Sequence, residues 1–326
     1  MKVHILDDYF DTLRHLPSFK KLADHDVTVW NDHENHIDRL ADRLADADAV
    51  ALFRERTEVG AELIKRLPKL KLVSQRGVYP HVNVPKLTEA GVMLCSARGK
   101  SWVSTAAAEL AFGLILVAAR QLDSQIASAR AGNWQAGIGR SLYGRKIGIY
   151  GYGELGRMVA GYAKAFGMDV IWWASERSRE RALNDGETVA KNRDAFFSDT
   201  DVVSLHLRLV EATRGIITAN DLGRMKPNSI LVNTSRAGLV EPGALRSALD
   251  KGRPGVAALD VFEKEPVWDP KNSLISHPRV IPTPHIGFVT EDELDRQFSD
   301  IYDQINAYAE GKPINIINPE VQRPQS

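Results

Sequence analysis

The sequence has a single cysteine among its 326 residues and no net charge. One cysteine excludes an internal disulfide and a metal site of several thiolates, which is typical of the reducing cytoplasm. We therefore interpret Cys95 as a small buried hydrophobic residue. The 42 basic residues are balanced by 42 acidic ones, and no dense run of lysine and arginine is present. Without a positive field to gather a polyanion, we expect no nucleic-acid partner.

Long hydrophobic runs are also absent. The N-terminal "MKVHILDDYF" lacks the apolar stretch of a signal peptide, so we expect a cytoplasmic protein. The most apolar segment, 106–120, is shorter than the roughly 20 residues that a membrane span requires, and it contains Glu109. We predict a buried helix there and no contact with a membrane.

Two polar groups raise the question of a metal or an anion. His33 and His36 lie three residues apart among carboxylates, a spacing that a metal site can use. We interpret them as part of a polar loop and predict no metal. Arg54 and Arg56 follow a predicted strand, and either contact an anionic substrate or solvate their loop.

Short β-branched runs alternate with helical patterns along the whole chain. This alternation is typical of βαβ units around parallel sheets, so we predict an α/β fold. A length of 326 residues with 44% hydrophobic and 26% charged residues favours two domains. The predicted strands are "KVHIL", "VTVW", "DAVALF", "LKLVS", "RKIGIY", "MDVIWW", "DVVSLHL", "SILVNT", "GVAALDVF" and "RVIPTP". The segment "DELDRQFSDIYDQINAYAEG" predicts one amphipathic C-terminal helix.

A glycine-rich turn links the strand "RKIGIY" to a predicted helix from Glu154 to Phe166. In the pattern G-x-G-x-x-G, Gly151 permits a tight bend, Gly153 lets the backbone approach a pyrophosphate, and Gly156 allows close packing. Glycines in such turns also serve steric needs alone. Because the turn lies between a clear strand and a clear helix, we predict dinucleotide binding.

The strand after this turn ends in Ala174, where NAD-binding folds place an acid that binds the adenosine ribose. Glu176 could substitute for that acid. Alternatively, Ser175, Arg177 and Arg179 could bind the 2′-phosphate of NADP. The choice between NAD(H) and NADP(H) therefore stays open.

Polar residues follow three later strands, at the carboxyl ends where open α/β sheets bind ligands. They are Arg236 in "LVNTSRAGLV", Glu265 in "AALDVFEKEP" and His285 in "IPTPHIGFVT". Reduction of a carbonyl beside a carboxylate needs a cation to hold the anion and an acid to deliver a proton. Arginine supplies the first, histidine the second, and a carboxylate beside the histidine favours the imidazolium. We predict that these three residues form a catalytic site.

The chain resembles the D-isomer-specific 2-hydroxyacid dehydrogenase family, in its phosphoglycerate dehydrogenase-like form, over nearly its whole length. The resemblance rests on "GRKIGIYGYGELG", "DVVSLHLRLVEATRGII", "LGRMKPNSILVNTSRAGLVE", "AALDVFEKEP" and "TPHIGFVT", in this order. It implies that Arg236 anchors the substrate, that His285 moves the proton and that Glu265 is its partner. The chain differs from the family pattern at Arg208, where proline is usual, and at Ala237, where glycine is usual.

The resemblance also implies ligand contacts. Backbone N–H groups near Arg76, Gly77 and Val78 would receive the substrate carboxylate, together with Arg236 and His285. The residues implied in cofactor binding are Gly151, Gly153, Glu154, Leu155, Gly156, Ser175, Arg177, His206, Thr213, Thr234, Ser235, Arg236, Asp260, His285 and Gly287.

For the architecture, the resemblance implies a Rossmann-type, doubly wound domain of residues 98–287. This domain would be inserted into a flavodoxin-like substrate domain of residues 1–97 and 288–326. The family forms homodimers through its cofactor domains, and the segment around Trp134 falls in the arm that makes this contact. Trp134 could otherwise be a core residue of its own subunit.

We therefore predict an NAD(P)-dependent D-2-hydroxyacid dehydrogenase, or 2-oxoacid reductase. Alternatives on the same scaffold are a formate- or phosphonate-type dehydrogenase and a dinucleotide-sensing corepressor or scaffold. Formate enzymes carry glutamine where Glu265 stands, which weighs against that alternative.

Because Ala174 removes the usual ribose acceptor, we expect weak discrimination between NAD(H) and NADP(H). The substitution Ala174→Asp should move the preference toward NAD(H), since a carboxylate accepts from the ribose and repels a phosphate. The ratio of kcat/KM for NADH and NADPH measures this shift. An existing preference for NADH that Ala174→Asp leaves unchanged would instead identify Glu176 as the acceptor.

Overall fold

The structure is a computed structural model that describes residues 1–97 and 104–322. The chain divides into two compact units. One consists of Met1–Val103 with Thr290–Ser326, and the other, Ser104–Val289, is inserted between these two segments. The predicted domain boundary at residue 98 lies outside the described residues.

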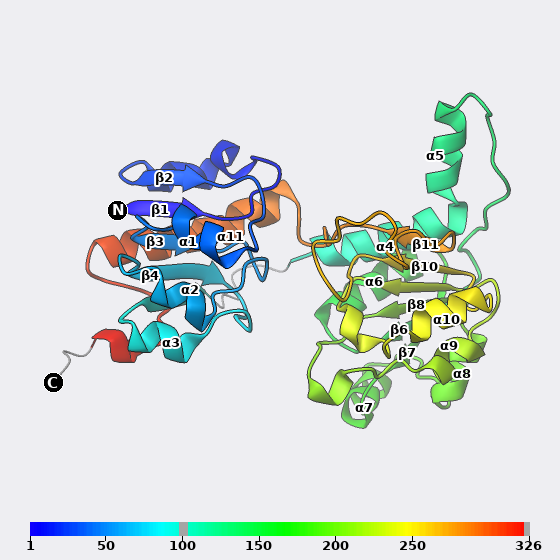
Figure 1. The fold of residues 1–326 in the computed structure, drawn as a ribbon. Coiled ribbons are helices and arrows are strands. Elements are labelled where there is room, and N and C mark those ends of the chain that lie inside the picture. Colours follow the sequence, from blue (N-terminus) through cyan, green and yellow to red (C-terminus); the bar gives the residue numbers. More distant parts are fainter. Residues whose placement is uncertain (98–103, 323–326) are drawn as a thin grey trace. The chain divides into compact units, whose positions relative to one another are not determined.

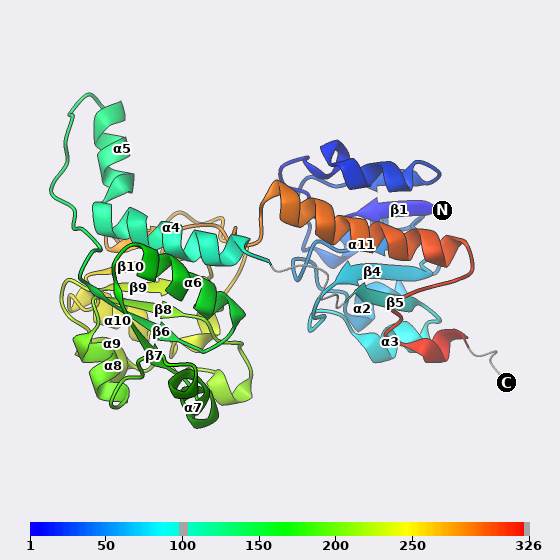
Figure 2. The ribbon, with the colours of Figure 1, turned by 180° about the vertical axis from the view of Figure 1, so that it is seen from behind.

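The first unit contains a five-stranded parallel sheet in the order β2-β1-β3-β4-β5. Helices α1 and α2 cover one face of the sheet and α11 covers the other (Figures 1 and 2). This is the strand order of flavodoxin-like doubly wound folds. Its elements are β1 (Lys2–Ile5), η1 (Leu13–His15), η2 (Pro17–Leu22), β2 (Asp26–Val29), α1 (Ile37–Arg43), β3 (Ala49–Ala51), α2 (Ala61–Lys65), β4 (Leu72–Arg76), α3 (Val84–Glu89), β5 (Met93–Ala97), α11 (Glu291–Ala309) and η5 (Pro319–Gln322).

Strand β5 is absent from the strands predicted from the sequence. All five of its residues are buried, and it pairs with β4 along its whole length. The available signal is the run of apolar residues that follows Gly91, which a fully buried strand shows in place of alternation. Cys95 lies in this strand with no exposed surface, which confirms its interpretation as a buried residue.

The second unit contains a six-stranded parallel sheet in the order β11-β10-β9-β8-β6-β7. Beyond β7, Val189 forms a parallel bridge to Trp172 and extends this edge. Its elements are α4 (Ala106–Arg120), α5 (Leu122–Arg130), β6 (Lys146–Tyr150), α6 (Glu154–Ala165), β7 (Asp169–Trp173), α7 (Glu176–Asn184), α8 (Arg193–Asp199), β8 (Val202–Leu205), η3 (Glu211–Thr213), α9 (Ala219–Arg224), β9 (Ile230–Asn233), η4 (Ala237–Leu239), α10 (Ala244–Asp250), β10 (Val256–Leu259) and β11 (Val280–Pro282).

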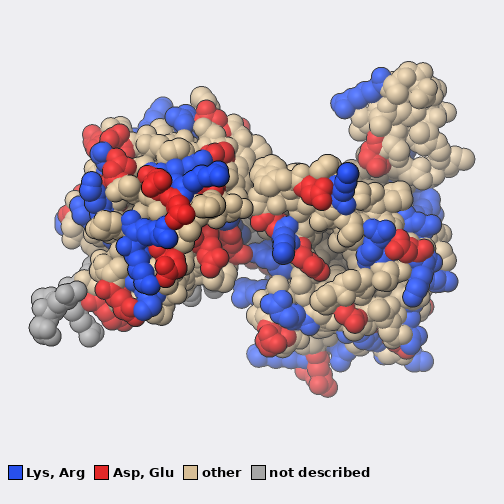
Figure 3. Space-filling view, in the orientation of Figure 1, with Lys and Arg blue, Asp and Glu red and all other residues tan. Residues whose placement is uncertain are grey.

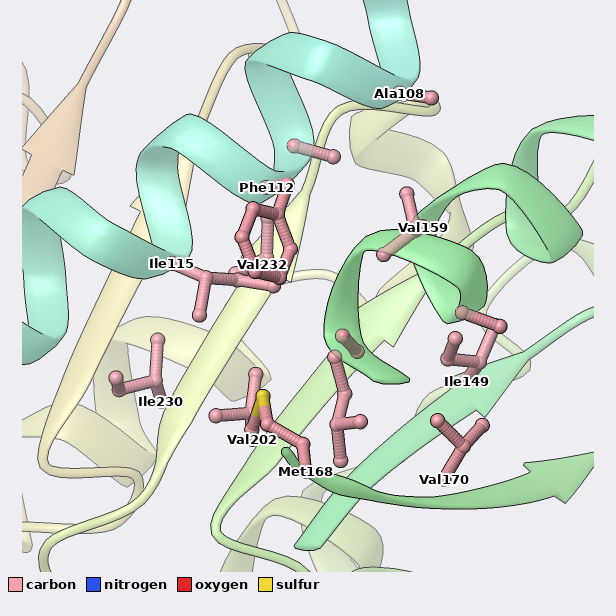
Figure 4. Packing of buried hydrophobic residues seen from close by; sticks show 14 of the residues in the cluster. Ala108, Phe112, Ile115, Ile149, Val159, Met168, Val170, Val202, Ile230 and Val232 are labelled. Atoms are coloured by element: carbon pink, nitrogen blue, oxygen red, sulfur yellow. The ribbon is translucent and has the colours of Figure 1, made fainter. Parts of the chain in front are cut away.

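Helices cover both faces of this sheet, so most of its strand residues are buried. On one face, α4 and α6 pack against the strands through side chains such as Phe112, Ile115 and Val159 (Figure 4). Helices α8, α9 and α10 contribute to a separate core cluster with other residues of the same strands. The predicted α/β class with doubly wound parallel sheets is confirmed in both units.

Helix α4 confirms the buried helix predicted at 106–120, and eight of its residues are buried. Within the described residues, no single helix is both long enough and apolar enough to cross a membrane. Helices α4 and α5 reach the length and apolar character of a membrane span only as a pair, and this pair is bent by 64°. The visible surface shows acidic and basic side chains interspersed, as the balanced composition predicts (Figure 3).

Candidate active site

The glycine turn joins β6 to α6, and two of its glycines are required by packing. A Cβ atom at Gly151, where φ is +113°, would lie 2.3 Å from the carbonyl oxygen of His206. A Cβ atom at Gly156 would lie 2.6 Å from the carbonyl oxygen of Gly151. Both distances are far below van der Waals contact, so any side chain would displace backbone at these positions.

Gly153 differs from the other two glycines because a Cβ atom there would meet nothing within 4 Å. It caps α6, whose first N–H groups, including those of Glu154 and Leu155, have no partner inside the helix. Open space beside free N–H groups and the positive end of a helix suits an anion. The turn therefore fits the pyrophosphate of a dinucleotide.

Tyr152 anchors this turn, a role that the sequence analysis did not identify. Its hydroxyl donates to Asp185 over 2.6 Å, and its ring packs edge-on against Trp172 at 4.7 Å. Burial and the neighbouring Asp185 raise the pKa of Tyr152 to about 12, so the hydroxyl keeps its proton and can donate. No local pattern reveals this contact, because Asp185 lies 33 residues away along the chain.

The end of β7 carries no acidic residue, since Ala174 is buried there. Ser175 caps α7 and is exposed, and so are Glu176 and Arg177. The guanidinium of Arg179 stacks on the ring of Trp173 at 4.2 Å. Of the two arginines considered for a 2′-phosphate, Arg179 is therefore already held by a ring.

The loop after β8 lies against the glycine turn. The N–H of His206 donates to the carbonyl of Tyr150 over 2.8 Å, and its Nε2 lies 2.9 Å from the hydroxyl of Ser204. Burial lowers the pKa of His206 to about 4, so the ring is neutral at neutral pH. The hydroxyl of Thr213 donates to the carbonyl of Arg208 over 2.6 Å and stabilises the following turn.

Asn233, the last residue of β9, organises the loop that carries Thr234, Ser235 and Arg236. Its side chain donates to the carbonyl of Arg236 over 2.9 Å and accepts from the N–H of Ser235 over 3.0 Å. The hydroxyl of Ser235 donates to the carbonyl of Leu205, and Arg236 Nη1 donates to the carbonyl of Ser235, both over 2.7 Å. The backbone position of Arg236 is thus defined by partly buried hydrogen bonds.

His285 and Glu265 form a hydrogen-bonded pair, with His285 Nδ1 2.5 Å from Glu265 Oε2. The other carboxylate oxygen of Glu265 accepts from the N–H of Phe262 over 2.7 Å. Both side chains are about 30% exposed, at 31% for His285 and 29% for Glu265. With Nδ1 held by the carboxylate, Nε2 is the ring atom available to a substrate.

Burial opposes ionisation of Glu265, but contacts that favour the carboxylate outweigh it. The hydrogen bond and charge of His285, the N–H of Phe262 and the charge of Arg236 together lower the pKa of the Glu265 carboxyl below its usual value. Glu265 is therefore a carboxylate at neutral pH. Arg236, Glu265 and His285 follow β9, β10 and β11, which are neighbours in the sheet, so the predicted trio is brought together at one edge.

Asp260 fixes the backbone around His285 and has no exposed surface. One of its oxygens accepts from the hydroxyl of Thr283 over 2.6 Å and from the N–H of Ile286 over 2.8 Å. The other accepts from the N–H of Gly287 over 2.8 Å. Between these contacts His285 has a φ of +53°, a conformation that costs energy and that such surrounding bonds maintain. Burial raises the pKa of Asp260, against the effect of these hydrogen bonds.

Arg76, Gly77 and Val78 lie in the first unit, at the end of β4. The side chain of Arg76 donates to Asp300 on α11 over 2.6 Å, and the N–H of Gly77 donates to the carbonyl of Ala97 over 3.0 Å. The N–H of Gly77 therefore has a partner within this unit, and the contact of this segment with a substrate carboxylate stays a prediction. Val78 is 60% exposed and is the member of the three best suited to meet a ligand.

The histidines considered as metal ligands have other partners. His33 Nδ1 lies 2.8 Å from Asp7, which also accepts from Thr57, and His36 Nδ1 lies 3.9 Å from Asp38. The described ranges, 1–97 and 104–322, contain no group of three or more His, Cys, Asp or Glu residues arranged to hold a metal.

Of the two arginines in the same half, Arg56 lies between the rings of Tyr9 and Phe53, at 4.3 and 4.1 Å. It also donates to the carbonyl of Asp7 over 2.7 Å, so it has a structural role. Arg54 Nη1 lies 3.7 Å from the place where a Cβ atom of Gly77 would be.

Comparison with known proteins identifies relatives over most of the chain. Residues 112–287 match the family model described as "D-isomer specific 2-hydroxyacid dehydrogenase, NAD binding domain". The chain is 32% identical to the glyoxylate reductase of Thermococcus litoralis over 294 residues, which cover 86% of this chain and 87% of that protein.

Two further relatives carry names that refer to phosphoglycerate. The D-3-phosphoglycerate dehydrogenase of Methanocaldococcus jannaschii is 35% identical over 86% of this chain, and the match spans 53% of that longer protein, about half its length. A crystal structure of phosphoglycerate oxidoreductase from Vibrio cholerae is 42% identical, with a TM-score of 0.90 over 95% of this chain and 99% of that chain.

The glycine turn supports a paired prediction. Gly151→Ala should destabilise the protein by about 3 kcal/mol or more, because it adds both backbone strain and a clash with His206. Gly153→Ala should change stability by less than about 0.5 kcal/mol, because its Cβ meets open space. It should nonetheless weaken NADH or NADPH binding about tenfold or more, because that space would receive the pyrophosphate.

Chemical unfolding of the protein alone and fluorescence titration with both dinucleotides separate the two effects. If Gly153→Ala bound dinucleotide as tightly as the unmutated protein, the open space at Gly153 would not be the pyrophosphate site.

Proposed function

The chain belongs to the D-isomer specific 2-hydroxyacid dehydrogenase family, and on that premise we propose that it transfers a hydride between a nicotinamide dinucleotide and a 2-oxoacid or D-2-hydroxyacid. The observation that carries the proposal is the 2.5 Å contact between His285 and Glu265, beside Arg236 at the ends of neighbouring strands. This arrangement supplies a cation, a proton donor and a carboxylate to orient the donor.

The nicotinamide ring, when bound, supplies or accepts the hydride. Arg236 binds the substrate carboxylate and polarises the adjacent carbonyl with its charge. In reduction, His285 donates the proton of Nε2 to the carbonyl oxygen as the hydride reaches the carbon. Glu265 holds Nδ1, orients the ring and stabilises the imidazolium. In the reverse direction, neutral His285 accepts the proton of the hydroxyl group.

For the cofactor, we assign the pyrophosphate to the turn of Gly151, Gly153, Glu154, Leu155 and Gly156, and the adenosine to the loops of Ser175, Arg177 and His206. Thr213, Thr234, Ser235, Arg236 and His285 follow strands at the same edge and are assigned to the nicotinamide half. Because Asp260 is buried and accepts three hydrogen bonds from the His285 loop, we assign to it the positioning of His285 and Gly287.

We assign cofactor binding to the unit 104–289 and part of the substrate contact to the other unit. There, the N–H of Val78 is the donor that we propose for the substrate carboxylate. Arg54, close to Gly77, is the cation that would meet a second anionic group of the substrate. A panel of 2-oxoacids with NADH and NADPH, followed by absorbance, tests both the reaction and the substrate class.

We further propose a cytoplasmic location, in keeping with the single buried cysteine.

We also propose a homodimer that forms through the unit 104–289. Helix α5 buries none of its residues, and α5 with the loop after it projects from its unit (Figures 1 and 2). Apolar side chains are exposed along this arm, with Trp134 at 77% and Ile138 at 89%. The interpretation of Trp134 as a core residue of its own chain is therefore wrong. An exposed apolar surface of this kind favours a protein partner, and a second copy of the chain matches the family.

Substitution of the catalytic trio should separate its roles. Arg236→Ala should raise KM for the oxoacid and lower kcat, whereas His285→Ala should lower kcat by roughly 10²- to 10⁴-fold with cofactor affinity nearly unchanged. Glu265→Gln should cost less and move the pH profile of reduction toward acid, because the imidazolium loses the charge that stabilises it.

Steady-state kinetics over a pH series and cofactor titration measure these effects, with the exposed His36→Ala as a matched control. The dehydrogenase proposal would be contradicted by a protein that binds dinucleotide but oxidises the reduced form with no oxoacid in a broad panel. A redox-dependent change in partner binding would then favour a dinucleotide sensor.

For the assembly, light scattering at micromolar concentration should give twice the monomer mass of 36.1 kDa. The double substitution Trp134→Asp and Ile138→Asp should shift this mass toward the monomer, because charges replace the apolar contact. Leu183→Asp, at a residue that is 59% exposed on α7, serves as the control. A monomer mass for the unmutated protein would end this proposal.

A further inference from the structure

Arg208 is an exposed arginine in the loop after β8 with no role in the site described so far. Within the described part of the chain, no ion pair, hydrogen bond or ring contact of its guanidinium is found. Its backbone, in contrast, is well anchored. The carbonyl of Arg208 accepts from the hydroxyl of Thr213 over 2.6 Å, and the same hydroxyl accepts from the N–H of Val210 over 2.9 Å. A cation is thus presented to solvent from a fixed turn.

The loop that carries Arg208 and the loop after β7 meet the glycine turn from two sides. Gly151 donates its N–H to the carbonyl of Trp173, the last residue of β7, over 2.8 Å. On the other side, a Cβ atom at Gly151 would lie 2.3 Å from the carbonyl of His206 and 3.2 Å from the side chain of Leu207. Strand β6 lies between β7 and β8 in the sheet. Arg208 and the residues after Trp173 therefore lie in loops on either side of the glycine turn, at the sheet edge whose crevice holds the adenosine in doubly wound folds.

The charges at this crevice favour a phosphate over a free ribose hydroxyl. Ala174 is buried and provides no carboxylate to accept from the ribose or to repel an anion. Arg177 is exposed on the first turn of α7, next to the exposed Ser175. Glu176 is the only acidic residue in the segment 174–179. A dianionic phosphate with arginines on two sides gains charge-assisted hydrogen bonds that a hydroxyl cannot make.

We propose that Arg208, together with Arg177 and Ser175, forms a site for the 2′-phosphate of NADP(H). Arg208 is then a specificity-determining residue, and the chain uses NADP(H) in preference to NAD(H). The inference rests on the proposed function only in requiring a dinucleotide at the glycine turn. This preference replaces the weak discrimination between NAD(H) and NADP(H) that we expected from the sequence. In the sequence, Arg208 stands out only as a departure from the family pattern.

The test uses fragments of the cofactor and needs no turnover. Adenosine 2′,5′-bisphosphate and adenosine 5′-monophosphate differ only in the 2′-phosphate, and calorimetric titration gives the affinity for each. We expect the bisphosphate to bind at least about tenfold more tightly. Arg208→Ala should weaken the bisphosphate about tenfold and the monophosphate less than about twofold, since the lost contact involves only the phosphate.

Two variants guard against indirect effects. Arg208→Gln keeps the length of the side chain without its charge and should repeat the loss, while thermal unfolding checks that each variant stays folded. Arg224→Ala removes an arginine from the last turn of α9 that pairs with Asp194 over 3.1 Å, and it should change neither affinity. NADPH and NADH titrations of the same variants should show the same selectivity.

The outcomes separate this inference from the proposed function. Equal affinity for the two fragments, or an equal loss of both in Arg208→Ala, would overturn the phosphate site. A preference for NADH that Glu176→Gln abolishes would also overturn it and identify Glu176 as the ribose acceptor. Failure to bind either NADPH or NADH would contradict the proposed function itself.

Discussion

The geometry of the proposed catalytic edge depends on one buried carboxylate. Asp260 accepts hydrogen bonds from residues on both sides of His285, and these bonds hold a histidine with a φ of +53° in place. A backbone conformation of this kind costs energy and persists only where its surroundings determine it. If the loop relaxed, the ring of His285 would move away from Glu265, and the pair would lose the contact that orients its proton.

The sheet provides the frame on which that carboxylate acts. Strands β9, β10 and β11 are parallel neighbours, so the residues that follow them emerge at the same edge. Asn233 at the end of β9 and Asp260 after β10 use their side chains to shape the adjoining loops. Buried polar side chains at strand ends thus hold irregular loops in fixed positions at the edge of a regular sheet. Their hydrogen bonds offset the cost of burial and restrict the loops to one arrangement.

At the proposed cofactor edge, backbone groups take the place of these side chains. Gly151 and Gly156 are glycines because backbone carbonyls occupy the places of their side chains, whereas Gly153 leaves its place open. The crevice beside them is bordered by the loops after β7 and β8. The side chains on these loops differ from the family pattern at Ala174 and Arg208, which is where a cofactor preference can change without any change in fold.

Much of the fold was predictable from the sequence, because parallel strands and their covering helices leave strong periodic patterns. The glycine turn and the strand-end residues Arg236, Glu265 and His285 were predictable for the same reason: each is tied to a local strand or turn. Strand β5 was missed because its sequence, MLCSA, contains no β-branched or aromatic residue, unlike the equally buried strands β3, β8 and β9.

Other features depend on residues far apart in the chain, so only the tertiary structure decided them. These include the hydrogen bond from Tyr152 to Asp185 and the hydrogen bonds that Asp260 accepts around His285. They also include the hydrogen bond from the Gly77 N–H to the carbonyl of Ala97 and the exposure of Trp134. Local sequence patterns report which face of an element is apolar. They do not report which distant atom completes a hydrogen bond, and that is set by the packing of the whole unit.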